Sequence, residues 1–374
     1  MEFRVSTDDM NYGLGMVTRA IAVRPIKQAY EGVLIETPDD GLLLTSTDGE
    51  MTIKAHINAQ IAQDGCTIMP AKLLAELMRR QSAGDVDFRI DQNMRASIRT
   101  RGSSTNMAGM TAEDFPDIPD VQPGNVVTLP CGRLRDAISK VMFAVSTDES
   151  RKILTGILIE TYQNETRLVG LDGFRLALQR IEGENPVPEG KEYISAIVPG
   201  RVMNELSRML PDDDDKMAVL TYSPSHIMIS FDNVRLYTTL LTGEFIDYKR
   251  ILPEKWTTEI VVQRQLFGEA IERCGLMARE GKNNLIYLDL EEGHMAMTSA
   301  AERGDVREDM EIGFTGEKMR IAFNSRFLTD VIRNVDSDSI RMCFNSSVSP
   351  CLIRPVEGNR YTFLVLPVRT FNNH

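Results

Sequence analysis

The sequence GVLIET at residues 32–37 returns almost unchanged as GILIET at residues 156–161, 124 positions later. A third version, LIYLDL, occupies residues 285–290. Each is an apolar run of the length that forms one buried strand. Self-similarity at a nearly constant spacing is typical of a chain built from copies of one structural unit. The sequence therefore predicts three repeats of about 125 residues each.

The same succession of elements surrounds each repeated strand. Asp-Gly pairs at residues 48–49 and 172–173 predict tight hairpin turns in the first two repeats, because glycine adopts positive φ without steric cost. Apolar residues at i, i+3 and i+4 predict two helices per repeat, one before the repeated strand and one after it. The expected helices are residues 13–23, 134–143 and 267–277 before the strand, and residues 70–78, 199–206 and 324–332 after it.

Two helices and several strands in each repeat define an α+β fold with three domains. The links between repeats resemble each other, with FPD at residues 115–117 in the first and FID at residues 245–247 in the second. We place the domains at residues 1–122, 123–250 and 251–374.

The composition excludes several classes of protein. A net charge of −12 over 374 residues excludes a chain that holds nucleic acid through overall positive charge. No apolar run of about 18 residues and no signal-peptide pattern is present, so we expect a cytoplasmic protein. The five cysteines are scattered without a C-x-x-C pair and the four histidines are dispersed, which predicts buried thiols and no metal or cofactor.

Pairs of basic residues, seven positions apart and therefore on one helical face, recur at matching places in the three repeats. They are Lys72 with Arg79, Arg201 with Arg208, and Arg326 with Arg333. Lys140 and Arg273 match each other in the preceding helices, with Arg24 as a less regular counterpart in the first repeat. A solvated helix face explains any one pair, but threefold recurrence in an acidic chain favours a local positive surface that attracts a phosphate backbone.

Four features in chain order resemble the bacterial DNA sliding clamp family, the beta subunit of DNA polymerase III. They are the threefold repeat, LDGFRLA at residues 171–177, FIDYKRILP at residues 245–253 and LPVR at residues 366–369. The resemblance covers essentially the whole chain. It implies the DNA clamp fold, in which helices of three repeated domains line an inner surface, antiparallel sheets lie outside, and two subunits close head to tail into a ring.

The resemblance implies a processivity factor that is not an enzyme. Its implied partners are encircled duplex DNA, the replicative DNA polymerase, a clamp loader, other replication and repair proteins that carry a clamp-binding peptide, and a second copy of the chain. A ring retains DNA by topology, so weak and sequence-independent attraction to the inner surface is sufficient. The implied DNA-facing residues are Arg24, Lys72, Arg79, Lys140, Arg201, Arg208, Arg273, Arg326 and Arg333.

The resemblance also implies an apolar pocket for partner peptides between the second and third domains. By position it comprises Leu154, Leu171, Gly173, Phe174, Arg175, Leu176, Ile246, Arg250, Ile251, Leu364, Val365, Leu366, Pro367, Val368 and Arg369. Without the resemblance, the apolar members are equally well explained as core residues. Leu171, Phe174 and Ile246 stand where the family often has Thr, His and Pro, so we expect a more apolar pocket with an altered peptide preference.

Two further regions differ from the family pattern. Thr105 and Met107 lie where the family tends to have an aromatic residue and a leucine, facing Leu276 and Met277 of a second copy, so we expect a weaker dimer. Residues 370–374 (TFNNH) extend past the usual end, and we expect disorder there rather than a cover over the pocket.

Two other classes of function remain alternatives. A hydrolase or nuclease requires a convergent nucleophile, base or metal site, and no such residues occur at a recognisable spacing. A repeat-built scaffold that binds proteins without encircling DNA explains the repeats and the acidity. It does not explain the basic helix faces that recur in all three repeats.

Overall fold

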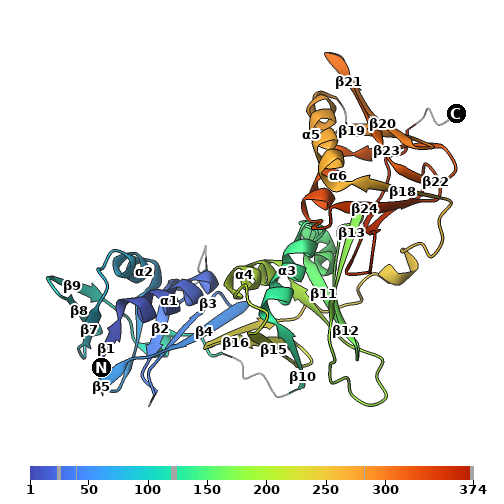
Figure 1. The fold of residues 1–374 in the computed structure, drawn as a ribbon. Helices are drawn as coiled ribbons and strands as arrows, with labels where there is room; N and C mark the ends of the chain where they lie inside the picture. Colours follow the sequence, from blue (N-terminus) through green and yellow to red (C-terminus); the bar gives the residue numbers. More distant parts are fainter. Residues whose placement is uncertain (23–26, 39, 119–123, 282, 371–374) are drawn as a thin grey trace. The chain divides into compact units, whose positions relative to one another are not determined.

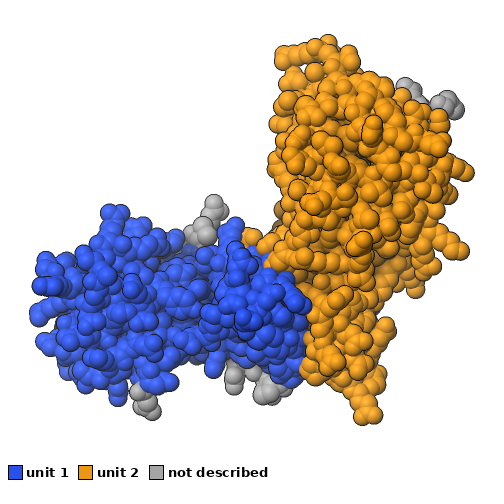
Figure 2. Space-filling model, in the orientation of Figure 1, with its two compact units in different colours: residues 1–135, 205–240 blue, residues 136–204, 241–374 orange. Residues whose placement is uncertain are grey.

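The computed structural model of the protein describes residues 1–22, 27–38, 40–118, 124–281 and 283–370 (Figure 1). The chain forms two compact units, residues 1–135 with 205–240 and residues 136–204 with 241–374 (Figure 2). None of the described helices combines the length and the apolar character that crossing a bilayer requires.

Unit 1 contains two antiparallel sheets. The five-stranded sheet has the order β5 (Gln60–Gln63), β1 (Glu2–Ser6), β7 (Asp85–Ile90), β8 (Arg95–Thr100) and β9 (Ser103–Ala108). The eight-stranded sheet has the order β10 (Asn125–Pro130), β15 (Met217–Tyr222), β16 (His226–Phe231), β17 (Val234–Thr239), β4 (Met51–Ile57), β3 (Leu42–Thr47), β2 (Gly32–Glu36) and β6 (Cys66–Pro70). The second sheet joins two sequence repeats, because β17 pairs with β4.

Unit 2 also contains two antiparallel sheets. The nine-stranded sheet has the order β14 (Ile194–Pro199), β11 (Gly156–Thr161), β12 (Glu165–Leu171), β13 (Arg175–Glu182), β26 (Tyr361–Val365), β25 (Cys351–Pro355), β24 (Ser339–Phe344), β18 (Thr258–Gln263) and β22 (Gly313–Gly316). The four-stranded sheet has the order β21 (Gly304–Glu311), β20 (His294–Ala301), β19 (Leu285–Glu291) and β23 (Met319–Asn324). Here β13 pairs with β26 and so joins the second repeat to the third.

The helices confirm the predicted α+β class, and one of them, the first, begins earlier than predicted. They are α1 (Thr7–Val17), α2 (Ala71–Arg79), α3 (Cys131–Met142), α4 (Gly200–Met209), α5 (Arg264–Glu280) and α6 (Ser325–Arg333). Short 3-10 segments are η1 (Thr18–Ala20), η2 (Gln28–Glu31), η3 (Ala112–Asp114), η4 (Glu149–Thr155) and η5 (Tyr248–Arg250). The helix expected at residues 13–23 begins earlier because the Ser6 hydroxyl accepts a hydrogen bond from the backbone N–H of Asp9 at 3.0 Å and caps α1. Residue 23 lies outside the described residues.

The repeated hairpin turns are confirmed, whereas one cysteine was predicted wrongly. Gly49 and Gly173 both have φ of +93°, the left-handed conformation that the Asp-Gly pairs predict.

Four of the five thiols are buried, but Cys66 is exposed. It is the first residue of β6, and the next three residues of that strand, Thr67, Ile68 and Met69, are fully buried, so the exposure is confined to the strand's start.

Close packing of α1 on its sheet depends on a residue without a side chain. Gly13 is buried, and a Cβ there would lie 2.7 Å from Leu44 Cδ1 and 2.9 Å from Ile57 Cγ2. Gly15, two residues later on the same helix, is exposed and would place a Cβ in open space. Gly13 therefore lets α1 approach β3 and β4, whereas Gly15 only weakens the helix.

These two glycines give a matched pair of variants. Gly15→Ala should raise the midpoint temperature of the first unfolding transition by about 1–3 °C, because alanine lowers the backbone entropy of the unfolded chain. Gly13→Ala should lower it by several degrees, since overpacking costs about 1–3 kcal/mol. Differential scanning calorimetry measures both, and a stabilised Gly13→Ala would contradict the packing described for α1.

Candidate functional site

The pairing of β13 with β26 brings the predicted peptide residues together within unit 2. Leu176 stands opposite Leu364 in the register of the two strands. Beyond the strand, the backbone N–H of Leu366 donates a hydrogen bond to the Phe174 carbonyl at 2.9 Å. The C-terminal segment therefore lies directly beside the Asp-Gly turn of the second repeat.

Most of the predicted apolar residues share one cluster, which we call the apolar cluster. Its buried members are Leu154, Leu158, Val169, Leu171, Leu176, Leu178, Ile197, Tyr248 and Leu364. Half-buried Ile251 and Leu366 pack against it. Val365 is fully buried outside this cluster, because successive residues of a strand point to opposite faces of the sheet.

Exposed residues surround the apolar cluster. Phe174 is 55 % exposed, and its ring stacks on Phe327 of α6 with centroids 5.8 Å apart. Ile246 is also exposed, and the exposed Arg250 pairs with Asp247 at 2.9 Å. Of the remaining predicted residues, Gly173 forms the turn, Pro367 and Val368 are half-buried, and Arg369 is exposed.

Arg175, predicted to contact a peptide, is largely enclosed by the protein itself. Its guanidinium pairs with Asp172 at 2.9 Å and with Asp330 of α6. It also lies over the rings of Phe143 and Phe327, at 5.3 and 4.9 Å from their centroids. Arg175 thus connects the Asp-Gly turn to α6 and fixes the ring on which Phe174 stacks.

Sequence reasoning missed Phe327 and Tyr248 as members of this region. Phe327 follows the apolar spacing of its helix, and Tyr248 lies in a short link between repeats. Neither position carries a sequence signal that separates a site residue from an ordinary core residue. Their place becomes visible only once β13, α6 and residues 245–252 are brought together.

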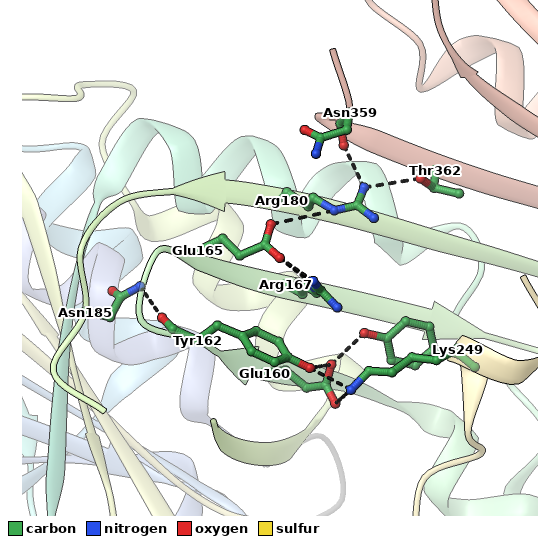
Figure 3. Close-up of polar contacts among 10 residues, drawn as sticks. Glu160, Tyr162, Glu165, Arg167, Arg180, Asn185, Lys249, Asn359 and Thr362 are labelled. Carbon is green, nitrogen blue, oxygen red and sulfur yellow. Dashed lines mark hydrogen bonds and ion pairs between the residues drawn. The ribbon is translucent and has the colours of Figure 1, made fainter. Parts of the chain in front are cut away.

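Polar contacts also hold β26 against β13. Arg180 donates hydrogen bonds to the Asn359 carbonyl at 2.6 Å and to Thr362 Oγ1 at 3.2 Å (Figure 3). Glu165 forms an ion pair with the same guanidinium, with Oε2 3.7 Å from Arg180 Nε. Burial lowers the pKa of Arg180 from its ordinary value, and these acceptors compensate for the loss of water around its charge.

The predicted DNA-facing cations differ in their partners. Lys72, Arg79 and Arg326 are exposed, and within the described residues none of their charged groups pairs with a carboxylate. Arg208 pairs with Glu205 at 3.3 Å, Arg333 with Glu272 at 3.6 Å, and Arg273 with Glu308 at 2.8 Å. Arg201 is exposed on α4, and Arg24 lies outside the described residues.

Lys140 is the most enclosed of these cations. Its side chain is 12 % exposed, and its ammonium pairs with Asp136 at 2.9 Å and Asp336 at 2.5 Å. Arg360 contacts the same two carboxylates, at 2.5 and 3.1 Å. This four-residue network joins α3 to the loop after α6, so the charge of Lys140 is balanced inside the protein.

A surface hollow between α5 and α6 brings several predicted residues together. Arg273, Arg326 and Arg333 line it with Leu276. Glu269, Glu272 and Asp330 line it as well, so carboxylates offset part of its positive charge. The described residues contain no group of three His, Cys, Asp or Glu side chains placed to hold a metal ion.

The predicted dimer residues lie at one sheet edge and on α5. Thr105 and Met107 belong to β9, an edge strand, but Met107 is buried on the face it shares with Ala96. Leu276 is 63 % exposed on α5, and Met277 is half-buried. Residues 371–374 of the predicted C-terminal tail lie outside the described part of the chain.

Repeated antiparallel α+β units with exposed helix cations define a three-domain clamp protein. Three domain families of the DNA polymerase III beta subunit match in chain order. The N-terminal domain matches residues 1–119, the central domain residues 128–247 and the C-terminal domain residues 249–369. The chain belongs to the DNA polymerase III beta subunit family.

Relatives and solved structures agree over the full length. The beta sliding clamps of Halalkalibacterium halodurans and Bacillus subtilis are each 28% identical, over 99% of this chain and 100% of theirs. The crystal structure of the Bacillus subtilis DNA polymerase sliding clamp has a TM-score of 0.94 at 27% identity, covering 99% of this chain and 100% of that one. A putative beta subunit from Eubacterium rectale also has a TM-score of 0.94, at 26% identity and with the same coverage of both chains.

Proposed function

We propose that the protein is a sliding clamp, a homodimeric ring that encircles duplex DNA and tethers the replicative DNA polymerase. Its role is that of a processivity factor and is not enzymatic. The observation that carries this proposal is the match of all three beta subunit domains, in order, over a chain with the clamp fold. We also propose that it acts in the cytoplasm, with a clamp loader and with repair proteins that carry a clamp-binding peptide.

Ring closure is supported by opposite charges at two sheet edges. The β8–β9 hairpin carries exposed Arg95, Arg99 and Arg101, and none of these guanidinium groups pairs with a carboxylate in the described residues. The edge strand β21 carries exposed Asp305 and Glu311, and its exposed Arg307 is paired with Asp309 at 2.8 Å, so the strand is acidic overall. Edge strands present unpaired backbone groups, so β9 of one copy and β21 of another can pair with charge complementarity.

A topological test decides the proposal. Protein loaded onto nicked circular DNA should co-elute with the DNA in gel filtration and should be lost after the circle is cut, because a ring slides off a free end. Retention on linear DNA, or no retention on the circle, would contradict encirclement.

Charge reversal supplies the matched controls for this test. Arg99→Glu should weaken the dimer and abolish retention, whereas Arg235→Glu, the same single reversal on the central strand β17, should leave both unchanged. Light scattering reports the dimer independently of DNA.

The unpaired helix cations are the strongest candidates for DNA contact. An arginine or lysine already paired with a carboxylate releases fewer counterions from a phosphate than an unpaired one does. We therefore place Lys72, Arg79 and Arg326 first, and Lys140 last, among the predicted DNA-facing residues.

Removal of two unpaired charges should alter the salt dependence of DNA binding. Lys72→Ala/Arg79→Ala should make the slope of log affinity against log salt shallower by about 2 on duplex DNA, since each lost phosphate contact removes about 0.9. Arg4→Ala/Arg89→Ala changes the net charge equally but removes arginines paired with Asp87 and Glu2. That control should keep the wild-type slope in a fluorescence anisotropy salt series, and equal slopes in all three proteins would contradict the assignment.

We assign the partner-peptide site to the apolar cluster and its exposed border. Branched apolar side chains accept the leucine and aromatic residues of a short peptide, and Arg250 supplies an exposed cation beside them. The exposed Phe174 ring, fixed by Phe327, adds a large apolar contact at the position where the family often has His.

Truncation of the C-terminal wall should weaken peptide binding. Leu366→Ala should lower the affinity for a polymerase clamp-binding peptide about tenfold, because it removes apolar contact from a wall of the site. Leu73→Ala makes the same chemical change at an exposed position of α2, in unit 1, and should have no effect. Isothermal titration calorimetry compares them, and equal affinities would place the peptide elsewhere.

A further inference from the structure

A buried carboxylate lies next to the proposed peptide site. Glu160 of β11 is 4 % exposed. Its Oε2 accepts hydrogen bonds from the Tyr248 hydroxyl at 2.5 Å and from the Tyr162 hydroxyl at 3.0 Å. Lys249 Nζ lies 3.5 Å from Oε1 (Figure 3). A carboxylate removed from water requires such partners, so this arrangement fixes all four side chains together.

Lys249 is held by aromatic rings as well as by charge. Its Nζ lies 4.8 Å from the ring centroid of Tyr193, 5.3 Å from that of Tyr162 and 5.8 Å from that of Tyr248. It also donates a hydrogen bond to the Tyr162 hydroxyl at 2.6 Å. Cation–π attraction adds to the ion pair and restricts a side chain that is otherwise flexible.

Tyr248 connects this polar network to the apolar cluster. It is 2 % exposed and belongs to the apolar cluster with Leu171 and Leu364. Burial, and after it the hydrogen bond to Glu160, raise the pKa of Tyr248 well above its ordinary value. The phenol therefore stays protonated and keeps donating to the carboxylate at physiological pH.

The position of Tyr248 determines the position of the residues that follow it. The backbone N–H groups of Ile251 and Leu252 donate to the Tyr248 carbonyl at 3.1 and 3.2 Å. Ile251 packs against the apolar cluster, and Arg250 is exposed beside it. One wall of the proposed peptide site is thus a short turn whose first residue is hydrogen-bonded to Glu160.

The first repeat contains the same carboxylate without this arrangement. Glu36 is the equivalent of Glu160 in the repeated strand, but it is half-buried and its carboxylate has no hydrogen bond or ion pair among the described residues. The matching link carries Ile118 where the second has Tyr248. In the third copy of the strand the position is Asp289, which pairs with Arg320 at 3.5 Å. Of the two glutamates, the one with partners among the described residues belongs to the repeat whose link borders the proposed peptide site.

We propose that Glu160 is a positioning residue of the peptide site. Through Tyr248 and Lys249 it fixes residues 245–252, so that Arg250 and Ile251 are already in position to contact an extended peptide. This inference rests on the proposed function of the site. Glu160 itself does not contact the peptide. It lowers the conformational entropy that the turn loses on binding, because the turn is already ordered in the free protein.

The first test measures peptide affinity by fluorescence anisotropy with a labelled, synthetic clamp-binding peptide of a replicative polymerase. Tyr248→Phe removes one hydroxyl and should weaken binding about fivefold, and Glu160→Leu should weaken it about tenfold or more. Glu160→Gln keeps an acceptor for Tyr248 and should restore part of the affinity lost in Glu160→Leu. Glu36→Gln is the matched control and should bind as the wild type does.

The second measurement needs no peptide. Amide hydrogen exchange of residues 245–252 in the free protein should be faster in Glu160→Leu and Tyr248→Phe than in the wild type, with α2 unchanged. Circular dichroism and light scattering verify that each variant is folded and dimeric.

The outcomes separate the two hypotheses. Wild-type peptide binding with unchanged affinity in Glu160→Leu and Tyr248→Phe would overturn the positioning role alone. A wild-type protein that binds no peptide would overturn the proposed function of the site. In that case, faster exchange would still support the fixing of residues 245–252 by Glu160, and unchanged exchange would overturn it.

Discussion

Strand pairing across the repeat boundaries is the constraint on which the rest of this structure depends. A strand at the edge of a sheet leaves backbone N–H and C=O groups without partners, and these groups are satisfied when another strand pairs there. In unit 1, β17 of the second repeat pairs with β4 of the first, and in unit 2, β13 pairs with β26 of the third. The sheets therefore continue from one repeat into the next, and the two compact units do not coincide with the three sequence repeats.

The same pairing creates the proposed peptide site. It places the last strand of the chain against the strand that follows the Asp-Gly turn of the second repeat. The apolar cluster then collects residues from η4, β11, β12, β13, β14, β26 and the link around Tyr248. No single repeat contains this combination, so the site belongs to the junction and to neither domain alone.

The basic residues differ in whether a carboxylate lies beside them, and this difference separates their roles. Cations that face carboxylates stabilise the protein locally, as Lys140 does between Asp136 and Asp336. Exposed cations such as Lys72 and Arg79 keep their charge available to solvent and to a phosphate backbone. In an acidic chain, the distribution of unpaired charge indicates a nucleic-acid surface more reliably than the total charge does.

The sequence by itself determined the threefold repeat, the α+β class, most of the helices and the hairpin turns, because strand alternation, helical spacing and glycine at positive φ are local properties. It also placed basic residues on one face of each repeat helix. Only the tertiary structure decided which of these cations are paired, that Cys66 is exposed and that Arg175 is enclosed between Asp172 and Asp330. It alone gave Glu160 its partners, although Glu36 occupies the same place in the sequence pattern. The physical reason is that burial and charge pairing depend on strands and links far apart in the chain, whose proximity no local pattern records.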